Sequence, residues 1–506
     1  MHRLRTIRWA LITVVVLGLL LTTSAGVPAK APEIRQVVVG QSIDHLALEI
    51  YFAIAVPSQS VSYHMLEPLV MLDDSLTSLK YRLATSITPL NSLTWQVKLR
   101  ENVKWHDGAP FTSEDVRFTF DRMRDPDRKL LHVVPADIFD DVKVVDEHTV
   151  NIVLKVPYAP LPRRLTEFPI VPKHAVEAMG DIAFGKAPIG TGPYRFKEWV
   201  KGDKVVIEAN ADYWDGKPQY DRIVFRTIPE ASTRVSEFAA GNLDVVCDVP
   251  SELVPMVKST RNGNAVMVDG LRYMYIGINT FEKPFDDVRV RQALNYAVDK
   301  KAIVDKILGG LASVANGPLG PASYGYNQSV PVYEYNPEKA RELLRAAGYP
   351  NGFSTTFDLG RRFPKDREVA LAVIGYLEQV GIKCTLNEME WGTFWSQKYM
   401  PKKATGLHFY GFADMIGDAD LPLYFLYHKS SGMEYYNTPQ LNSSLEAGRA
   451  ELDQTKRQEI YHKVLHDIVD DAAAIWMYVG KDVYGVMNGV NWTPRSDGRV
   501  LFYDMK

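Results

Sequence analysis

The sequence predicts an α/β protein that is large enough for two or three domains. The chain has 506 residues, of which 46% are hydrophobic, so it can bury more than one core. Apolar and polar side chains alternate over residues 93–99 and 140–156, which predicts β-strands with one buried face. Residues 355–389 instead follow the order strand, helix, strand, with Gly381 between the helix and the second strand. β-rich segments followed by a β-α-β rhythm indicate an α/β fold.

The first 25 residues have the pattern of a secretory signal peptide. Three arginines precede an apolar run over residues 9–21, and small residues follow up to Ala25. A membrane span needs about twenty apolar residues, so this run is short for one. We expect cleavage after Ala25 and, because no cysteine lies near that position, no lipid anchor. An exported protein without an anchor is retained only by an outer membrane, which predicts a periplasmic location.

The composition gives no support for nucleic-acid binding. The formal net charge is −3, whereas recognition of a phosphate backbone calls for a basic patch. No second apolar run approaches the length of a membrane span.

The best-defined local motif is a strand, a turn and a capped helix over residues 93–120. Gly108 follows Asp107 and can adopt the positive φ that a turn requires. Thr112 and Asp115 occupy the two ends of a capping box, so a helix should begin here. His106 stands beside a carboxylate, as in general acid–base sites, but no nucleophile or second histidine lies near it. We therefore interpret this motif as structural.

A short glycine motif follows at residues 190–192. Gly190 and Gly192 match two of the three glycines of a dinucleotide-binding fingerprint. Because a strand-like run rather than a helix follows, we interpret the motif as a turn.

Capping residues mark the later elements. Asp287 and Asn336 each precede an amphipathic helical pattern, and Thr455 opens a capping box that predicts a helix to residue 471. The tail from residue 474 to 506 is strand-like.

Three blocks of this sequence resemble one known family. They are LTWQVKLRENVKWHDGAPFTSEDV, IGTGPYRFKEWVKGDKVVIEANADYWDGKP and YIGINTFEKPFDDVRVRQALNYAVDKKAIVDKI. They resemble the family 5 solute-binding proteins of bacterial ABC importers, the receptors for dipeptides, oligopeptides and, in some members, nickel chelates, haem or opines. With the helical blocks at 335–349 and 361–381, the resemblance covers most of residues 34–490.

The resemblance implies a two-lobed periplasmic binding protein of type II, similar to cluster C, with an extra subdomain in the first lobe and a two-strand hinge. The implied boundaries are a signal peptide at 1–25, lobe I at 26–270 with the subdomain at about 61–188, lobe II at 271–480, and a return to lobe I at 481–506. Such a monomeric receptor closes around its ligand, and the permease in the inner membrane recognises the closed form.

The resemblance also predicts the state of the two cysteines. Cys247 and Cys384 both lie in strand-like runs, and a disulfide between them would be chemically allowed in an oxidising compartment. The resemblance assigns them to different lobes, so we expect two buried free thiols.

A peptide ligand would need charged partners, because its ammonium and carboxylate lose water when the receptor closes. Residues 410–426, YGFADMIGDADLPLYFL, resemble the family segment Trp-x-x-Asp, whose Asp pairs with the ligand amine in peptide-binding members. Asp414 matches that position, and Asp418 is the second candidate for the same role. The usual tryptophan is replaced by Tyr410 or Phe412. An Asp-rich turn with side-chain caps is the alternative interpretation.

Four further residues are candidates by resemblance. Arg362 lies near the position where dipeptide binders hold the ligand carboxylate, and Trp391 resembles an aromatic residue that lines the cleft. Tyr63 and His64 lie in a segment that opens the smaller part of lobe I and could face a ligand. The alternatives are a solvated loop arginine, a core aromatic residue and a hydrogen-bonded packing histidine.

The expected function is a periplasmic receptor that delivers a di- or oligopeptide to an ABC importer. Within this fold, the alternative ligands are a nickel chelate, haem, an opine or an oligosaccharide. From another class, a secreted hydrolase could use Asp414, Asp418 and Asp420 as a general acid–base pair. We predict neither a cofactor nor a metal site. His462 and His466 share one face of a helix whose other face is apolar, which favours a solvated face over a metal site.

Overall fold

The computed structural model describes residues 34–53, 55–131, 135 and 137–503 of the chain. The predicted signal peptide and its cleavage site at Ala25 therefore lie outside the described residues. The elements below belong to one compact unit that begins at Arg35. Within the described ranges, no helix combines the length and the apolar character that a membrane span requires.

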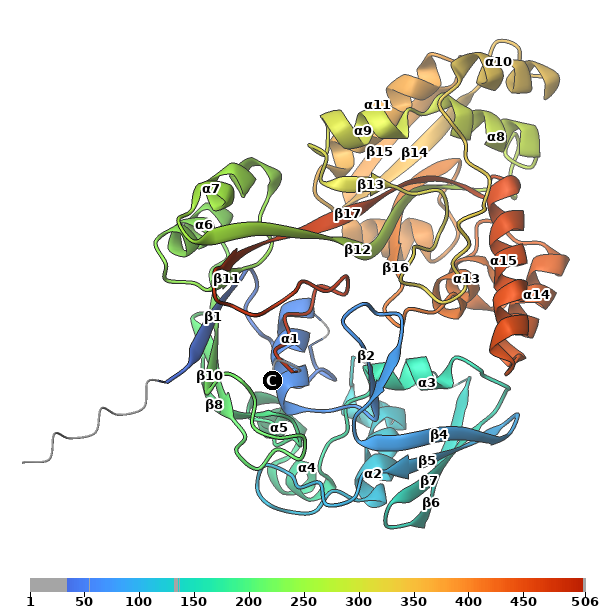
Figure 1. The fold of residues 1–506 in the computed structure, drawn as a ribbon. Coiled ribbons are helices and arrows are strands. Elements are labelled where there is room, and N and C mark those ends of the chain that lie inside the picture. Colours follow the sequence, from blue (N-terminus) through green and yellow to red (C-terminus); the bar gives the residue numbers. More distant parts are fainter. Residues whose placement is uncertain (1–33, 54, 132–134, 136, 504–506) are drawn as a thin grey trace, which may run out of the picture. The chain divides into compact units, whose positions relative to one another are not determined.

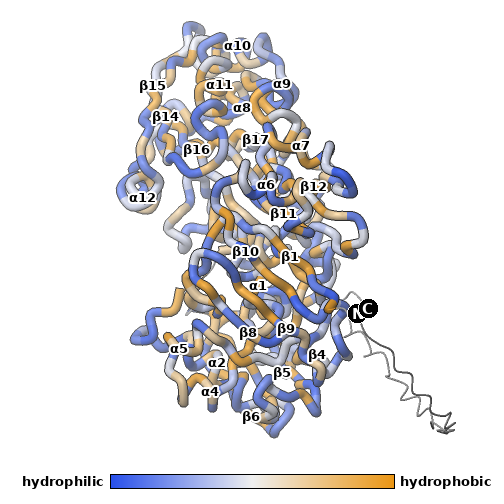
Figure 2. The backbone as a smooth tube through the Cα atoms, turned by 90° about the vertical axis from the view of Figure 1, so that its left-hand side faces the viewer, coloured by the Kyte–Doolittle hydropathy of each residue, from blue (hydrophilic) through white to orange (hydrophobic). Residues whose placement is uncertain are grey.

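One large mixed sheet runs through the molecule, in the order β15-β14-β16-β12-β17-β11-β1-β10-β9-β8, with β13 paired to β17 (Figure 1). Its strands are β1 (Gln36–Gln41), β8 (Tyr194–Val200), β9 (Lys204–Ala209), β10 (Arg222–Thr227), β11 (Val245–Val246), β12 (Gly263–Ile278), β13 (Ala312–Val314), β14 (Ser354–Arg361), β15 (Lys383–Glu390), β16 (Leu407–Ala413) and β17 (Ala474–Met487). Figure 2 shows the apolar stretches of β1 and β10, which are paired in parallel.

Two smaller sheets lie between β1 and β8 in the sequence. One pairs β2 (Val70–Leu72) with β3 (Leu79–Tyr81). The other has the order β4-β5-β7-β6 and is antiparallel throughout. Its strands are β4 (Ala84–Asn91), β5 (Thr94–Leu99), β6 (Phe139–Asp146) and β7 (Thr149–Leu154).

Helices connect and cover the strands. The α-helices are α1 (Val56–Met65), α2 (Ser113–Arg124), α3 (Leu161–Arg164), α4 (Lys173–Met179), α5 (Asp181–Lys186), α6 (Ala231–Ala239), α7 (Val254–Ser259), α8 (Val288–Ala297), α9 (Lys300–Lys306), α10 (Pro337–Ala346), α11 (Asp366–Glu378), α12 (Trp391–Thr393), α13 (Asp420–Tyr427), α14 (Pro439–Ala450) and α15 (Gln454–Asp470). A π-helix covers Phe394–Tyr399, and short 3₁₀ turns cover Pro126–Arg128, Leu165–Glu167, Ser251–Leu253 and Lys429–Ser431.

The locally predicted elements are confirmed where their signals were strongest. The strand at 93–99 is β5, and the capping box between Thr112 and Asp115 begins α2. Asp115 also accepts a hydrogen bond from the indole nitrogen of buried Trp105 at 3.3 Å, which ties the helix start to the core. Asn336 caps α10 through a 2.9 Å hydrogen bond from the amide of Lys339.

Three predictions need correction. The last long helix is capped by Asp453, which accepts hydrogen bonds from two backbone amides, and not by a box at Thr455. The tail is a strand only to Met487; residues 488–503 are irregular and pack Val500 and Phe502 into the core around β1 and β10. Both cysteines are free thiols, as predicted, but Cys384 is only half-buried.

Strands β12 and β17 connect two halves of the sheet. They pair antiparallel along most of their length (Figure 1). One end of the pair adjoins β11 and the core around β1, and the other end adjoins β16 and the core between α8 and α11. Their register shifts between Asp269 and Tyr273, so the pair is irregular at its middle. The residues that precede β12 and the residues between β12 and β17 therefore form separate hydrophobic cores. The two strands connect these cores.

The glycine motif at 190–192 lies against the end of α1. A β-carbon on Gly190 would come within 1.7 Å of the carbonyl oxygen of Met65, and one on Gly192 within 2.4 Å of that of His64. The motif is thus a close backbone approach, which only glycine permits.

We expect two Gly→Ala variants to change stability in opposite directions. Gly190→Ala should lower the free energy of unfolding by about 1–3 kcal/mol or more, because the new methyl group overlaps backbone atoms. Gly375→Ala, inside α11 with open space around it, should raise that free energy by about 0.5–1 kcal/mol, because alanine favours the helix. Urea unfolding of both variants measures the two changes. Changes of the same sign would contradict the packing of this loop.

Candidate functional site

A cavity of about 360 Å³ lies where β12 and β17 are irregular. This volume falls in the range typical of small-molecule sites. Residues from both separate cores and from the two crossing strands line it: Gln41, Val56, Pro57, Ser60, Cys247, Asp248, Gly270, Leu271, Arg272, Met274, Leu308, Leu311, Phe363, Pro364, Ala413, Met415, Tyr478, Gly480, Asp482, Tyr484, Ser496, Asp497, Gly498 and Val500. A ligand here would contact both halves of the molecule.

Two carboxylates in this lining lack a cationic partner. Asp482 on β17 and Asp248 after β11 form no ion pair within the described residues; Asp248 accepts one hydrogen bond, from the hydroxyl of Ser42 at 2.5 Å. Protein surrounds Asp482 on most sides, although water reaches it through the cavity. Burial, together with the nearby charges of Asp248 and Asp497, raises the pKa of Asp482 to about 7. A cationic group in the cavity would stabilise both carboxylates.

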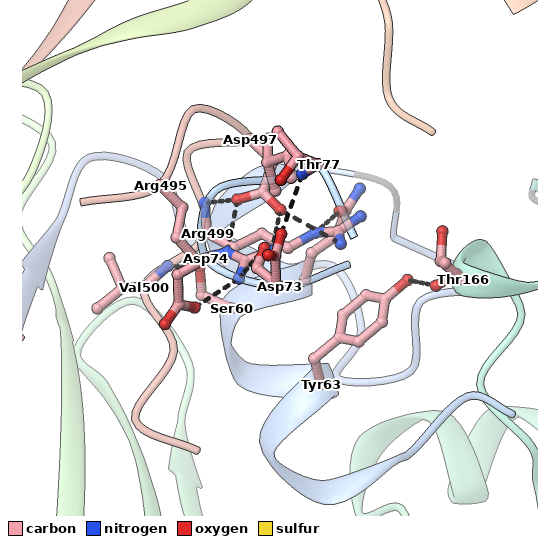
Figure 3. A network of polar contacts seen from close by, with 12 residues as sticks. Ser60, Tyr63, Asp73, Asp74, Thr77, Thr166, Arg495, Asp497, Arg499 and Val500 are labelled. Atoms are coloured by element: carbon pink, nitrogen blue, oxygen red, sulfur yellow. Dashed lines mark hydrogen bonds and ion pairs between the residues drawn. The ribbon is translucent and has the colours of Figure 1, made fainter. Parts of the chain in front are cut away.

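The third aspartate of the lining is fully paired (Figure 3). Asp497 accepts hydrogen bonds from Arg495 at 3.1 and 2.8 Å, and Arg499 lies 3.6 Å away. Although burial opposes it, these two guanidinium groups hold the pKa of Asp497 below its ordinary value. Arg495 also bonds Asp74, so this network ties the carboxyl-terminal tail to the turn after β2. Its charges are balanced internally and are not available to a ligand.

Two arginines beside Phe363 form no ion pair with a carboxylate in the part of the chain that the structure describes. Arg272 on β12 and Arg362 after β14 lie 5.4 and 5.5 Å from the ring centre of Phe363, which itself lines the cavity. Arg272 donates one hydrogen bond, to the carbonyl of Gly411 at 3.0 Å. Burial and the nearby charge of Arg362 lower the pKa of Arg272. A pair of unpaired guanidinium groups is a natural partner for a carboxylate.

Asp414 lies beside the cavity and not in its lining. It follows β16 between Ala413 and Met415, which do line the cavity. Its side chain is 1% exposed; one oxygen accepts a hydrogen bond from the amide of Asp418 at 3.1 Å, and the other has no partner among the described residues. Burial raises the pKa of Asp414 to about 7. Asp414 is therefore a buried carboxyl group, one of whose oxygens accepts no hydrogen bond from the described residues.

Asp418 and Asp420 each form an ion pair with a buried arginine. Arg457 donates two hydrogen bonds to Asp418, at 2.9 and 2.6 Å, and Arg449 donates two to Asp420, at 2.9 and 3.0 Å. All four side chains are at least half-buried, and Asp418 is completely so. These pairs connect α13 to α14 and α15. Neither carboxylate is free to serve as the acid or base of a hydrolase.

Trp391 and Tyr410 form an aromatic stack behind Arg362. The guanidinium of Arg362 lies 4.6 Å above the ring of Trp391, and the rings of Trp391 and Tyr410 stack with centres 5.8 Å apart. Tyr410 is buried on β16 and stacks in turn on Tyr399 at 4.5 Å. Phe412, the other candidate for the family's tryptophan, packs on Phe425. The stack holds Arg362 beside Phe363, which lines the cavity.

Tyr63 and His64 are both completely buried in α1 and face away from the cavity lining. The hydroxyl of Tyr63 donates to the carbonyl of Thr166 at 3.0 Å (Figure 3). His64 contacts the carbonyl of Ser60 through Nδ1 and accepts a hydrogen bond from the amide of Phe502 through Nε2 at 3.0 Å. Burial lowers the pKa of His64 to about 4, so it stays neutral. Both residues anchor the carboxyl-terminal tail to α1.

Sequence reasoning thus missed all four charged residues of the cavity lining. None of the seven predicted side chains is among those that line it, whereas Asp248, Arg272, Asp482 and Asp497 are. A signal was available for the first three, because each is a charged residue in an otherwise apolar strand-like run.

Comparisons with known proteins agree on one family. The family model of the bacterial extracellular solute-binding proteins, family 5 (middle), matches residues 78–434. The glutathione-binding protein GsiB of Pectobacterium atrosepticum is 30% identical over 468 residues, which are 90% of this chain and 90% of that protein. GsiB of Escherichia coli (strain K12) is 30% identical over 448 residues, which are 86% and 87% of the two chains.

Solved structures share the fold over nearly the whole chain. HbpA2 from Haemophilus parasuis superimposes with a TM-score of 0.85 at 26% identity, covering 92% of this chain and 99% of that one. The periplasmic binding protein DppA from Helicobacter pylori, in complex with the peptide STSA, superimposes with a TM-score of 0.74 at 25% identity, covering 92% and 97%. The predicted α/β fold is thereby confirmed as the mixed fold of cluster C periplasmic binding proteins.

The buried carboxyl group of Asp414 should make stability depend on pH. Its pKa of about 7 in the folded chain exceeds the value of about 4 expected after unfolding, so the folded state holds an extra proton between these values. The free energy of unfolding should therefore fall as pH rises from about 4 to about 7. In Asp414→Asn this fall should be smaller, and the variant should gain stability relative to the wild type at about pH 8.

Urea unfolding at several pH values measures the difference between wild type and Asp414→Asn. Asp305→Asn, which removes an exposed carboxylate on α9, is the matched control for the loss of an aspartate. Parallel profiles for wild type and Asp414→Asn would contradict the burial of this group.

Proposed function

This chain belongs to family 5 of the bacterial extracellular solute-binding proteins, and on that premise we propose that it captures a short peptide and delivers it to an ABC importer. It is the solute-binding protein of an ABC transporter and not an enzyme. The paired states of Asp418 and Asp420 agree with this assignment, because they leave no free acid–base pair at that position.

The observation that carries the peptide proposal is the charge pattern of the cavity. Within the described residues, Asp248, Asp482 and Arg272 of the lining form no ion pair, and neither does Arg362 beside Phe363. Asp248, Asp482 and Arg362 are exposed to solvent and Arg272 is half-buried, so a ligand that displaced this water would have to supply the opposite charges. A zwitterion does so with its ammonium and carboxylate. We therefore assign the ligand amine to Asp248 and Asp482 and its carboxylate to Arg272 and Arg362.

The comparisons support a small peptide in particular. The curated relatives named above bind glutathione, a tripeptide with one ammonium and two carboxylates, and DppA of H. pylori holds a short peptide. A cavity of about 360 Å³ suits a ligand of this size better than a long oligopeptide. Backbone groups of β12 and β17 at the irregular point could bind the peptide main chain without selecting side chains.

Capture would proceed by closure about β12 and β17. In this proposal the lobes are residues 26–270 with 481–506, and residues 271–480, and the two crossing strands form the hinge. The ligand contacts both lobes only in the closed form, so its differential affinity shifts the population towards closure. The permease in the inner membrane would then recognise the closed monomer in the periplasm. In this proposal, the charged residues of the cavity would contact the ligand fully only once the lobes have closed.

Native mass spectrometry of the purified protein, followed by release and weighing of the ligand, tests this proposal directly. We expect one molecule per chain, with masses of di- to tetrapeptides, because an enclosed ligand dissociates slowly. A single mass that belongs to a metal chelate or a sugar would keep the family assignment and overturn the peptide. The absence of any bound mass calls for calorimetry with a peptide library, where a lack of binding would count against the proposal.

Charge-removing variants test the two walls separately. Asp482→Asn should weaken binding of a free-amine peptide by about 30-fold or more. Arg362→Gln should weaken binding of a free-carboxylate peptide to the same extent, because each variant loses an ion pair with the ligand that closure would shield from water. The N-acetylated peptide should be insensitive to Asp482→Asn, and the amidated peptide should be insensitive to Arg362→Gln. Asp305→Asn is again the surface control. Equal losses for blocked and free peptides would assign these residues a structural role.

A further inference from the structure

Two segments that precede β12 contact two segments that lie between β12 and β17, away from the crossing strands. The first two are the turn at residues 73–78 and the region of α3 at residues 158–164. The others are residues 413–417 after β16 and the end of α14 at Arg449. We infer that these contacts form a clasp that holds the cavity closed in the absence of ligand. This inference rests on the proposed function, since it concerns the regulation of the same cavity.

Arg163 is the central residue of the clasp. Its guanidinium donates to the carbonyl of Thr77 at 2.6 Å and makes longer contacts with the carbonyls of Leu76 at 3.4 Å and Ile416 at 3.5 Å. No carboxylate pairs with it within the described residues, but its charge lowers the pKa of the buried Asp414 nearby. One side chain therefore links carbonyl groups of both separate cores.

A direct backbone contact lies next to Arg163. The amide of Ala159, which is buried, donates to the carbonyl of Arg449 at 2.8 Å. The Arg449 side chain lies 5.4 Å from the ring of Tyr158 and is fixed by its two hydrogen bonds to Asp420. If the two cores separated, the amide of Ala159 and the carbonyl of Arg449 would have to bond to water. The fixed position of Arg449 therefore favours the closed arrangement.

Apolar packing connects the clasp to the cavity. Leu72 and Leu76 form a small buried cluster with Leu271, and Ala413 and Met415 pack against it. Leu271, Ala413 and Met415 also line the cavity. The clasp thus continues directly into the cavity wall, so its opening would expose the cavity on this side.

Gly417 allows the two loops to approach. It has a φ of +62°, and a β-carbon there would lie 2.9 Å from Nη1 of Arg163 and 3.0 Å from the carbonyl oxygen of Leu76. Any larger residue would have to displace one of these atoms. This observation supports a contact that is built into both loops.

None of these contacts uses the unpaired charges of the cavity. Asp248, Asp482, Arg272 and Arg362 take no part in the clasp, so it can form before a ligand binds. The apparent dissociation constant equals the intrinsic constant divided by the fraction of molecules that are closed. A clasp that raises this fraction tightens binding and, because the ligand must wait for opening, slows association.

The experiment compares Arg163→Ala with Arg164→Ala in ligand-free protein, prepared by unfolding, dialysis and refolding. Arg164 lies on the same helix but pairs with Glu167 and packs on Phe168, both on its own side. Small-angle scattering gives the radius of gyration, and hydrogen exchange gives the protection of residues 158–164. We expect Arg163→Ala to expand and to exchange at least about tenfold faster in this segment, whereas Arg164→Ala should match the wild type.

Binding of the free-amine peptide completes the test. Arg163→Ala should bind about three- to tenfold more weakly and associate faster, in line with a lower closed fraction. If Arg163→Ala fails to fold, Gly417→Ala should give the same expansion by pushing the loops apart. Equal radii and equal exchange for the wild type and the folded variant would overturn the clasp. Expansion without peptide binding would uphold the clasp and reject the peptide proposal, because the scattering and exchange measurements need no ligand.

Discussion

The antiparallel pairing of β12 with β17 is the constraint on which the rest of this structure depends. Both strands are long, and each runs from one core to the other. Their register shifts between Asp269 and Tyr273, and residues 270–272 at this irregularity line the cavity. A β-bulge commonly redirects side chains in this way at functional sites. The same irregularity therefore lies between the two cores and directs Arg272 towards the cavity.

The distribution of ion pairs separates structural charges from those available to a ligand. Asp418, Asp420 and Asp497 each have one or two arginine partners at hydrogen-bonding distance. Buried carboxylates of this kind are tolerated because the partner replaces the lost water. In the cavity lining, Asp497 is paired in this way, whereas Asp248, Asp482 and Arg272 form no ion pair within the described residues. The paired charges hold α13, α14, α15 and the tail in place.

Close backbone approaches set the geometry around these charges. Gly190 and Gly192 let the loop before β8 pack on α1, which in turn holds the tail through His64 and Ser60. Gly417 lets the loop after β16 meet the turn before β3. These glycines bring together segments that are far apart in the chain. The first approach lies within one core, whereas the second lies between the two cores.

The α/β class, the family and the elements with local signals could be predicted from the sequence alone. The capping box at Thr112, the cap at Asn336 and the β-α-β order of residues 354–390 depend on neighbours a few residues away, which periodicity and side-chain type report directly. Which charged residues are paired depends on the tertiary structure. Asp418 is paired with Arg457, and Asp482 lies near Asp248, through contacts between distant parts of the chain. A sequence pattern cannot reveal such pairings, because the desolvation and charge partners of a side chain depend on which distant segments fold against it.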